Sequence, residues 1–139
     1  MSQEATQEFV KHTASCHCGT VRIEIDAPAE LDVDQCNCSV CERKGFLHII
    51  VPKSRMHILS GDEPGQMTTY TFGTHTAKHK FCSTCGISVF YIPRSNPDGF
   101  SVNARCIDSS TVKKMNIIPF NGRDNWEGEV DRLTDLSKE

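Results

Sequence analysis

Apolar residues occupy every second position from Val21 to Ile25, and charged residues fill the positions between them as far as Asp26. A period of two places the apolar side chains on one face of a β-strand. Residues 46–51 differ, because this run is almost continuously apolar and ends at Pro52. Its short length favours a strand buried on both faces over a helix. We therefore predict one half-buried strand and one central strand.

Further short strands are predicted between turns that are rich in glycine, proline, asparagine and serine. They cover residues 31–35, 56–59, 67–72, 78–81, 87–92 and 100–106. The best helix start is Asp108, whose carboxylate is able to cap a short helix that reaches Lys114. This spacing of short strands and turns predicts a mainly β domain with one minor helix.

The chain has 139 residues, a length typical of one domain with one core. We expect a flexible tail over residues 1–12, a folded domain over 13–130 and a polar tail over 131–139. Phe120 and Trp126 are expected to pack the C-terminal segment onto the domain.

Charge and hydropathy limit the classes of partner. The formal net charge is -3 and lysine and arginine form no block, so direct nucleic-acid binding has little support. No run approaches the roughly 18 apolar residues of a membrane span. The first residues also lack the apolar core of a signal peptide. We expect a cytoplasmic protein without membrane association, with the nucleus as the other compartment.

Seven of the eight cysteines fall into three tight clusters. These are Cys16 and Cys18, then Cys36, Cys38 and Cys41, and finally Cys82 and Cys85. Thiolates spaced by one or two residues reach a single metal ion from one turn, and two pairs complete a tetrahedral zinc shell. The even count also fits a disulfide framework, but disulfides are rare in the cytosol. The pattern therefore favours metal.

The cluster at residues 36–41 offers three thiolates, which leaves a fourth position for water, a substrate thiol or a distant side chain. If that position is open, a thiol bound to the metal is deprotonated. If His48 or another side chain closes the shell, the second zinc is structural.

The clusters read CHCG at 16–19, CNCSVC at 36–41 and FCSTCG at 81–86. In this order they resemble the glutathione-dependent formaldehyde-activating enzyme family. The flanks VPKSR, TTYTF, YIPRSNP and FNG, at residues 51–55, 68–72, 91–97 and 120–122, resemble its centromere protein V branch. The similarity runs from about residue 13 to residue 126.

The resemblance implies folded-over antiparallel sheets of the type shared with methionine sulfoxide reductase B, and two zinc ions per chain. It assigns the structural zinc to Cys16, Cys18, Cys82 and Cys85, and the reactive zinc to Cys36, Cys38 and Cys41. The implied activity is that of a carbon–sulfur lyase, which joins the glutathione thiol and formaldehyde as S-hydroxymethylglutathione.

Other side chains are weaker candidates. His48 is a candidate acid for the hemithioacetal oxygen or a partner of a metal ligand, with a satisfied core histidine as the equal alternative. Arg94 is a candidate for pairing with a glutathione carboxylate, against simple surface solvation. His75 and His79 share no face in a strand and turn context, so we expect both to be exposed.

Two alternatives belong to other classes. Cys106 follows Arg105 in a setting that faintly resembles the nucleophile region of methionine sulfoxide reductase B, which suggests a thiol redox reductase. The other alternative is a noncatalytic zinc module that binds a protein partner. The oligomeric state and the physiological thiol and aldehyde are left open.

Overall fold

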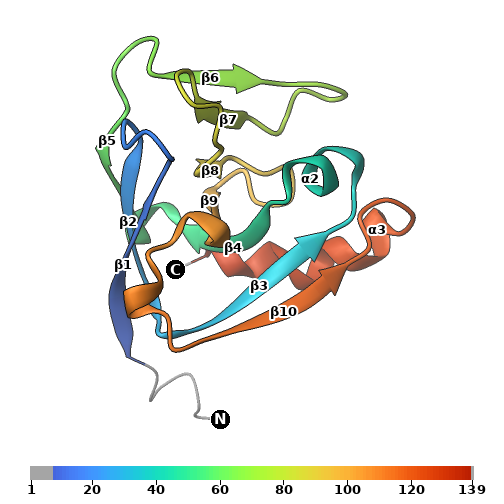
Figure 1. Ribbon diagram of the computed structural model, residues 1–139. Helices are drawn as coiled ribbons and strands as arrows, with labels where there is room; N and C mark the ends of the chain where they lie inside the picture. The colour runs from blue at the N-terminus through green and yellow to red at the C-terminus, as the bar shows by residue number, and fades with distance from the viewer. Residues whose placement is uncertain (1–7, 139) are drawn as a thin grey trace.

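The computed structural model describes residues 8–138, and within them the prediction of a mainly β protein is confirmed (Figure 1). One antiparallel sheet has the order β1-β2-β5. Its strands are β1 (Phe9–Ser15), β2 (Arg22–Pro28) and β5 (Met56–Ser60). Strand β2 is buried at every second residue, as its alternating sequence predicts.

A larger mixed sheet has the order β10-β3-β4-β9-β8. Its strands are β10 (Lys114–Phe120), β3 (Glu30–Cys36), β4 (Leu47–Pro52), β9 (Gly99–Asn103) and β8 (Phe90–Tyr91). Strand β4 is buried at all six positions, as its apolar sequence predicts. The third sheet is the hairpin of β6 (Met67–Tyr70) and β7 (His79–Cys82), which lies over one end of the molecule in Figure 1.

The two faces of β4 pack against different clusters. Ile49 and Val51 join the main core, which also takes side chains from β1, β2 and β5. Ile50 points the other way, into a smaller cluster with Phe120 and Leu133, against which Trp126 packs. This confirms the expected packing of the C-terminal segment. Because side chains alternate along a strand, His48 lies on the same face of β4 as Ile50.

The minor helix is not where the sequence predicted it. Asp108 caps a single 3₁₀ turn, η3 (Ser109–Thr111), by accepting a 2.9 Å hydrogen bond from the Ser110 amide. Strand β10 then begins at Lys114 and pairs in parallel with β3 over seven residues. Those interstrand hydrogen bonds take the backbone groups that a longer helix would use. Neither β10 nor its parallel pairing was predicted.

A six-residue α-helix, α2 (Ser39–Lys44), is instead built on the CNCSVC motif. It ends at Gly45, which adopts a left-handed conformation with φ 68° and donates its N–H to the Cys41 carbonyl. Glycine takes this conformation at little steric cost and commonly ends helices. The remaining helical segments are η1 (Lys53–Arg55), η2 (Ala104–Cys106), α3 (Trp126–Glu129), η4 (Val130–Arg132) and η5 (Thr134–Ser137). Among residues 8–138, no helix has the length and apolar character needed to cross a membrane.

Parts of both predicted tails are ordered. Strand β1 starts at Phe9, which pairs with Pro28, so order begins before residue 13; residues 1–7 of the expected tail lie outside the described residues. At the other end, Leu133 and Ser137 are buried, and the Asn96 amide donates hydrogen bonds to the Leu133 carbonyl and to Ser137 Oγ. The segment predicted as a polar tail is therefore packed as far as Ser137.

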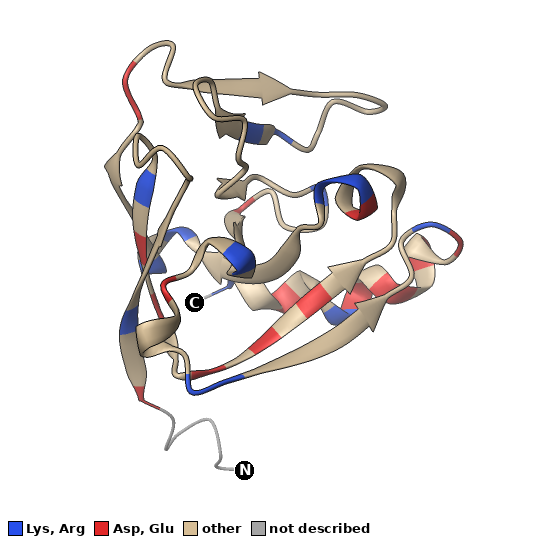
Figure 2. Ribbon diagram, in the orientation of Figure 1, with Lys and Arg blue, Asp and Glu red and all other residues tan. Residues whose placement is uncertain are grey.

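Acidic residues gather along β3 and the C-terminal helical segment, whereas lysine and arginine are scattered (Figure 2). Among them, Asp34 is 6% exposed and accepts a 2.7 Å ion-paired hydrogen bond from Arg132. This pair ties the C-terminal segment to β3.

Candidate metal centres and cleft

The four-cysteine set comes together as the sequence predicted. The sulfur atoms of Cys16, Cys18, Cys82 and Cys85 all lie within 4.8 Å of one another. Cys18 Sγ lies 3.7 Å from Cys16 Sγ and 3.6 Å from Cys82 Sγ. Four sulfur donors at such separations are the ligand set of a structural zinc site. This set joins the end of β1 to the end of β7.

Backbone groups support the first site. The Val21 amide donates to Cys16 Sγ at 3.2 Å, and the Thr84 amide donates to Cys82 Sγ at 3.4 Å. Such bonds favour thiolates. Cys16 and Cys82 are 3% and 1% exposed, and burial raises the pKa of the Cys16 thiol to about 11. A buried thiol with a raised pKa forms a thiolate when a cation lies beside it, so this environment is consistent with a bound metal ion.

The second set also converges. The sulfur atoms of Cys36, Cys38 and Cys41 lie within 4.8 Å of one another, and this set of mutually close ligand atoms includes no other described residue. Cys36 ends β3, Cys38 is the N-cap of α2, and Cys41 is buried within that helix. The end of a strand followed at once by a helical turn therefore directs three sulfurs to one point.

The charges of these three sulfurs depend on one another. Hydrogen bonding from Cys36 and Cys41 lowers the pKa of Cys38 to about 2. Hydrogen bonding to Cys38 raises the pKa of Cys36 to about 11, and bonding to Cys36 raises the pKa of Cys41 further. The cluster therefore carries one negative charge readily. Three thiolates require a cation among them, which fits a metal ion at this site.

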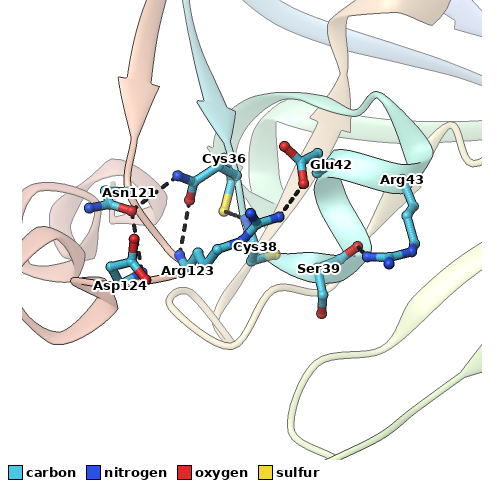
Figure 3. Close-up of polar contacts among 9 residues, drawn as sticks. Cys36, Cys38, Ser39, Glu42, Arg43, Asn121, Arg123 and Asp124 are labelled. Atoms are coloured by element: carbon cyan, nitrogen blue, oxygen red, sulfur yellow. Dashed lines mark hydrogen bonds and ion pairs between the residues drawn. The ribbon is translucent and has the colours of Figure 1, made fainter.

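The loop after β10 holds the second set in place (Figure 3). The Asn37 side chain donates to Asn121 Oδ1 at 3.0 Å and accepts from the Arg123 amide at 2.9 Å. Arg123 also forms an ion pair with Glu42 of α2. Segments more than 80 residues apart are thereby clamped around the three sulfurs. The FNG motif at 120–122 marked this loop, but its partner was not evident from the sequence.

The three sulfurs open into a cleft of about 240 Å³. Its walls are mostly apolar and aromatic, and its polar groups include Asp34, His48, His79 and Arg94. The apolar and aromatic lining comprises Val40, Ile50, Phe72, Ala77, Tyr91, Pro93, Phe120, Trp126 and Leu133. A concave apolar pocket with a few converging polar groups is the usual form of a small-molecule site. The sequence predicted neither Asp34 nor Tyr91 in this wall, because each is a single residue in a strand-like pattern.

His48 reaches the cleft, but in a different state from the expected acid. It is 5% exposed, and burial lowers its pKa to about 3, so the ring is neutral near pH 7. Nδ1 lies 2.9 Å from Ser101 Oγ and 3.3 Å from the Tyr91 hydroxyl. Nε2 is buried and has no hydrogen-bond partner in the described part of the chain. Its nitrogens are not among the ligand atoms grouped with the three sulfurs, so the geometry does not support His48 as a fourth ligand.

The prediction for His79 was wrong, whereas His75 is exposed as predicted. His79 is 5% exposed, with its ring stacked between Phe72 at 5.4 Å and Tyr91 at 4.8 Å. The Lys44 ammonium lies 3.4 Å from His79 Nδ1. His79 begins β7, and the β6–β7 hairpin packs against β8, which buries this ring against Tyr91. Local sequence does not reveal this long-range packing.

Arg94 lies at the rim of the cleft. Its side chain is exposed, and its guanidinium carbon lies 3.5 Å from the centroid of the Trp126 ring. Stacking on an aromatic face holds the planar guanidinium while leaving its donors free for a ligand.

Cys106 is not among the residues that line the cleft. It is half-buried, and burial raises the pKa of its thiol to about 11. A redox nucleophile needs a lowered pKa, so the environment of Cys106 opposes the thiol reductase alternative.

Comparisons with known proteins identify a family and a similar solved structure. The sequence model of the glutathione-dependent formaldehyde-activating enzyme family matches residues 11–120. Among solved structures, the crystal structure of a Rhodobacter sphaeroides protein matches with a TM-score of 0.61 and 35% sequence identity. The match covers 76% of this chain and 99% of that chain.

Proposed function

Since the chain belongs to the glutathione-dependent formaldehyde-activating enzyme family, we propose that it joins glutathione and formaldehyde as S-hydroxymethylglutathione, a carbon–sulfur lyase type of activity. The observation that carries the proposal is the position of three converging cysteine sulfurs at the wall of a small-molecule cleft. Cys16, Cys18, Cys82 and Cys85 form a complete set of four ligands elsewhere in the fold. The three-cysteine set is therefore available for a metal ion that takes part in the reaction.

We assign a structural zinc to Cys16, Cys18, Cys82 and Cys85, and a reactive zinc to Cys36, Cys38 and Cys41. A zinc ion held by three thiolates would lower the pKa of an added thiol and hold its sulfur as a thiolate. The cleft beside the three sulfurs leaves space for a small aldehyde. In this proposal Arg94, which stacks on Trp126 at the rim, would pair with a carboxylate of glutathione.

In this reaction the thiol first gives its proton to solvent. The sulfur lone pair then forms a bond with the carbonyl carbon of formaldehyde, and the π electrons of the carbonyl move to its oxygen. That oxygen takes a proton from water, which replaces the proton lost by the thiol. The product, S-hydroxymethylglutathione, therefore contains all the atoms of glutathione and formaldehyde, and no other reactant is consumed. The centromere protein V-like branch and a cytoplasmic location are parts of the same proposal.

Native mass spectrometry of the purified protein, with and without glutathione, tests the first step. We expect two zinc ions per chain and a glutathione adduct that disappears in Cys38→Ser. Formaldehyde kinetics then test the second step, because thiols add to formaldehyde without help and the protein must exceed that background. Two zinc ions that ignore glutathione, with no rate above background, would refute the proposal and favour the noncatalytic binding module.

A further inference from the structure

One buried polar atom in the cleft wall lacks a partner. His48 Nε2 has less than 1 Å² exposed and no hydrogen-bond partner among residues 8–138. A buried nitrogen without a hydrogen-bond partner destabilises the folded state. Native structures keep few such groups, and each one calls for a reason. Because His48 lines the cleft, a ligand is the natural partner for this atom.

Strand β4 fixes where the imidazole lies. His48 pairs with Asp34 of β3 on one side and with Asn103 of β9 on the other, so its backbone is held in the middle of the sheet. The ring centroid lies 4.6 Å from that of Phe46 and 5.6 Å from that of Tyr91. The ring is therefore held by packing before any ligand arrives.

The neighbours of Nδ1 determine which nitrogen carries the proton. Ser101 is fully buried, and within the described chain its hydroxyl has one side-chain partner, His48 Nδ1 at 2.9 Å. The Tyr91 hydroxyl also lies 3.3 Å from Nδ1. Among residues 8–138, His48 Nδ1 is the partner of both hydroxyls, and a hydroxyl without another acceptor donates to it. A neutral imidazole that accepts at Nδ1 carries its proton on Nε2.

We propose that the Nε2–H of His48 donates a hydrogen bond to the oxygen of the aldehyde and of its hydroxymethyl adduct, which makes His48 a catalytic residue of the second half of the reaction. This inference rests on the proposed function, since it takes the adduct as the occupant of the cleft. It replaces the expected acid with a neutral donor. His48 transfers no proton, and water still supplies the proton that the alkoxide takes up.

The role of such a donor is electrostatic. Negative charge develops on the carbonyl oxygen as the carbon–sulfur bond forms, and a fixed donor stabilises this charge more than it stabilises the neutral aldehyde. Ser101 and the aromatic neighbours already hold the ring, so only the groups that cover Nε2 have to move when the ligand enters. Burial keeps the ring neutral and therefore able to donate from one nitrogen alone.

Two ligands that differ in one hydroxyl test the proposal. S-hydroxymethylglutathione, kept in excess formaldehyde, carries the acceptor oxygen, whereas S-methylglutathione lacks it. The wild-type protein should bind the first about fivefold more tightly, the equivalent of one neutral hydrogen bond. His48→Leu should abolish this preference, and His48→Gln, which keeps an N–H donor, should retain part of it. A preference unchanged in His48→Leu would overturn the proposal.

A spectroscopic measurement on the wild-type protein needs no variant to fold. Long-range ¹H–¹⁵N spectra of histidine-labelled protein should show His48 with an unprotonated Nδ1 and a protonated Nε2. The Nε2 proton should shift with S-hydroxymethylglutathione and stay in place with S-methylglutathione. A proton found on Nδ1 would overturn the assignment. If the protein fails to accelerate the reaction, the proposed function falls, while these two readouts still decide the role of His48 in binding.

Discussion

Gly122 lies against the sulfur of Cys36, so closely that a β-carbon on this glycine would stand 2.7 Å from Sγ. The same carbon would lie 3.4 Å from the β-carbon of Cys38. The FNG loop and the three-cysteine set are therefore packed without room for a single added methyl group. This relationship makes Gly122 part of the metal-binding geometry although it supplies no ligand.

We expect Gly122→Ala to fold but to lose or weaken the metal ion at the second site, because Cys36 must move away from the added carbon. Zinc stoichiometry by native mass spectrometry should fall from two toward one. Gly128→Ala is the matched control, since its added carbon meets the exposed side chain of Asn125, which is free to turn away. Equal zinc content in Gly122→Ala and the control would contradict the packing argument.

The two cysteine sets should differ in what they hold together. Cys16 and Cys82 join segments 66 residues apart, and a metal between them constrains a long loop of the unfolded chain. Cys82→Ser should therefore lower the Tm by about 10 °C or more, or prevent folding. Cys38→Ser should leave a folded protein that lacks one zinc. Equal thermal destabilisation by both would show that the proposed division between structural and reactive sites is wrong.

Arg94→Lys should weaken glutathione binding without disturbing the fold. Lysine keeps the charge but loses the two-pronged hydrogen bonding and the stacking on Trp126. We expect the KM for glutathione to rise about tenfold, roughly 1.4 kcal/mol, with little change for formaldehyde. Arg22→Lys, at an exposed position in β2, is the control. A KM for glutathione that does not change would leave Arg94 as a solvated surface residue.

Burial of His48 predicts acid sensitivity. Its pKa falls from 6.5 in the unfolded chain to about 3 in the fold, so the folded state binds fewer protons. The loss of folding stability caused by burying His48 is absent well above pH 6.5 and grows as the pH falls below that value. The free energy of unfolding of His48→Gln, measured relative to that of the wild type, should therefore be about 1–2 kcal/mol higher at pH 5 than at pH 7. Urea unfolding at both pH values measures this, and parallel curves would contradict it.

Cys106→Ser should keep both zinc ions and the full rate of adduct formation, because the Cys106 thiol has a raised pKa and does not line the cleft. The test is the steady-state rate beside that of Cys38→Ser. Loss of activity in Cys106→Ser with retention in Cys38→Ser would reverse the assignment and revive the thiol reductase.

Strands with a clear apolar pattern in their own sequence were well predicted, whereas a strand without such a pattern was not. Strands β2 and β4 carry their burial in their own alternation or continuous apolar run. Strand β10 has no such pattern, since Asn116 and Pro119 interrupt its apolar residues, and its parallel partner lies more than 80 residues away. The helix predicted after Asp108 failed for the same reason, because pairing with β3 outweighed a local capping signal.

By itself the sequence determined the two sets of sulfur ligands and the mainly β character, because ligand spacing and side-chain period are properties of a few consecutive residues. The tertiary structure decided the rest of the site. It placed Asn121, Gly122 and Arg123 around the three sulfurs, and it buried the His79 ring between Phe72 and Tyr91. It also left His48 Nε2 without a hydrogen-bond partner among residues 8–138. Such contacts depend on which distant segments share a core, and packing of this kind leaves no periodic trace in the chain.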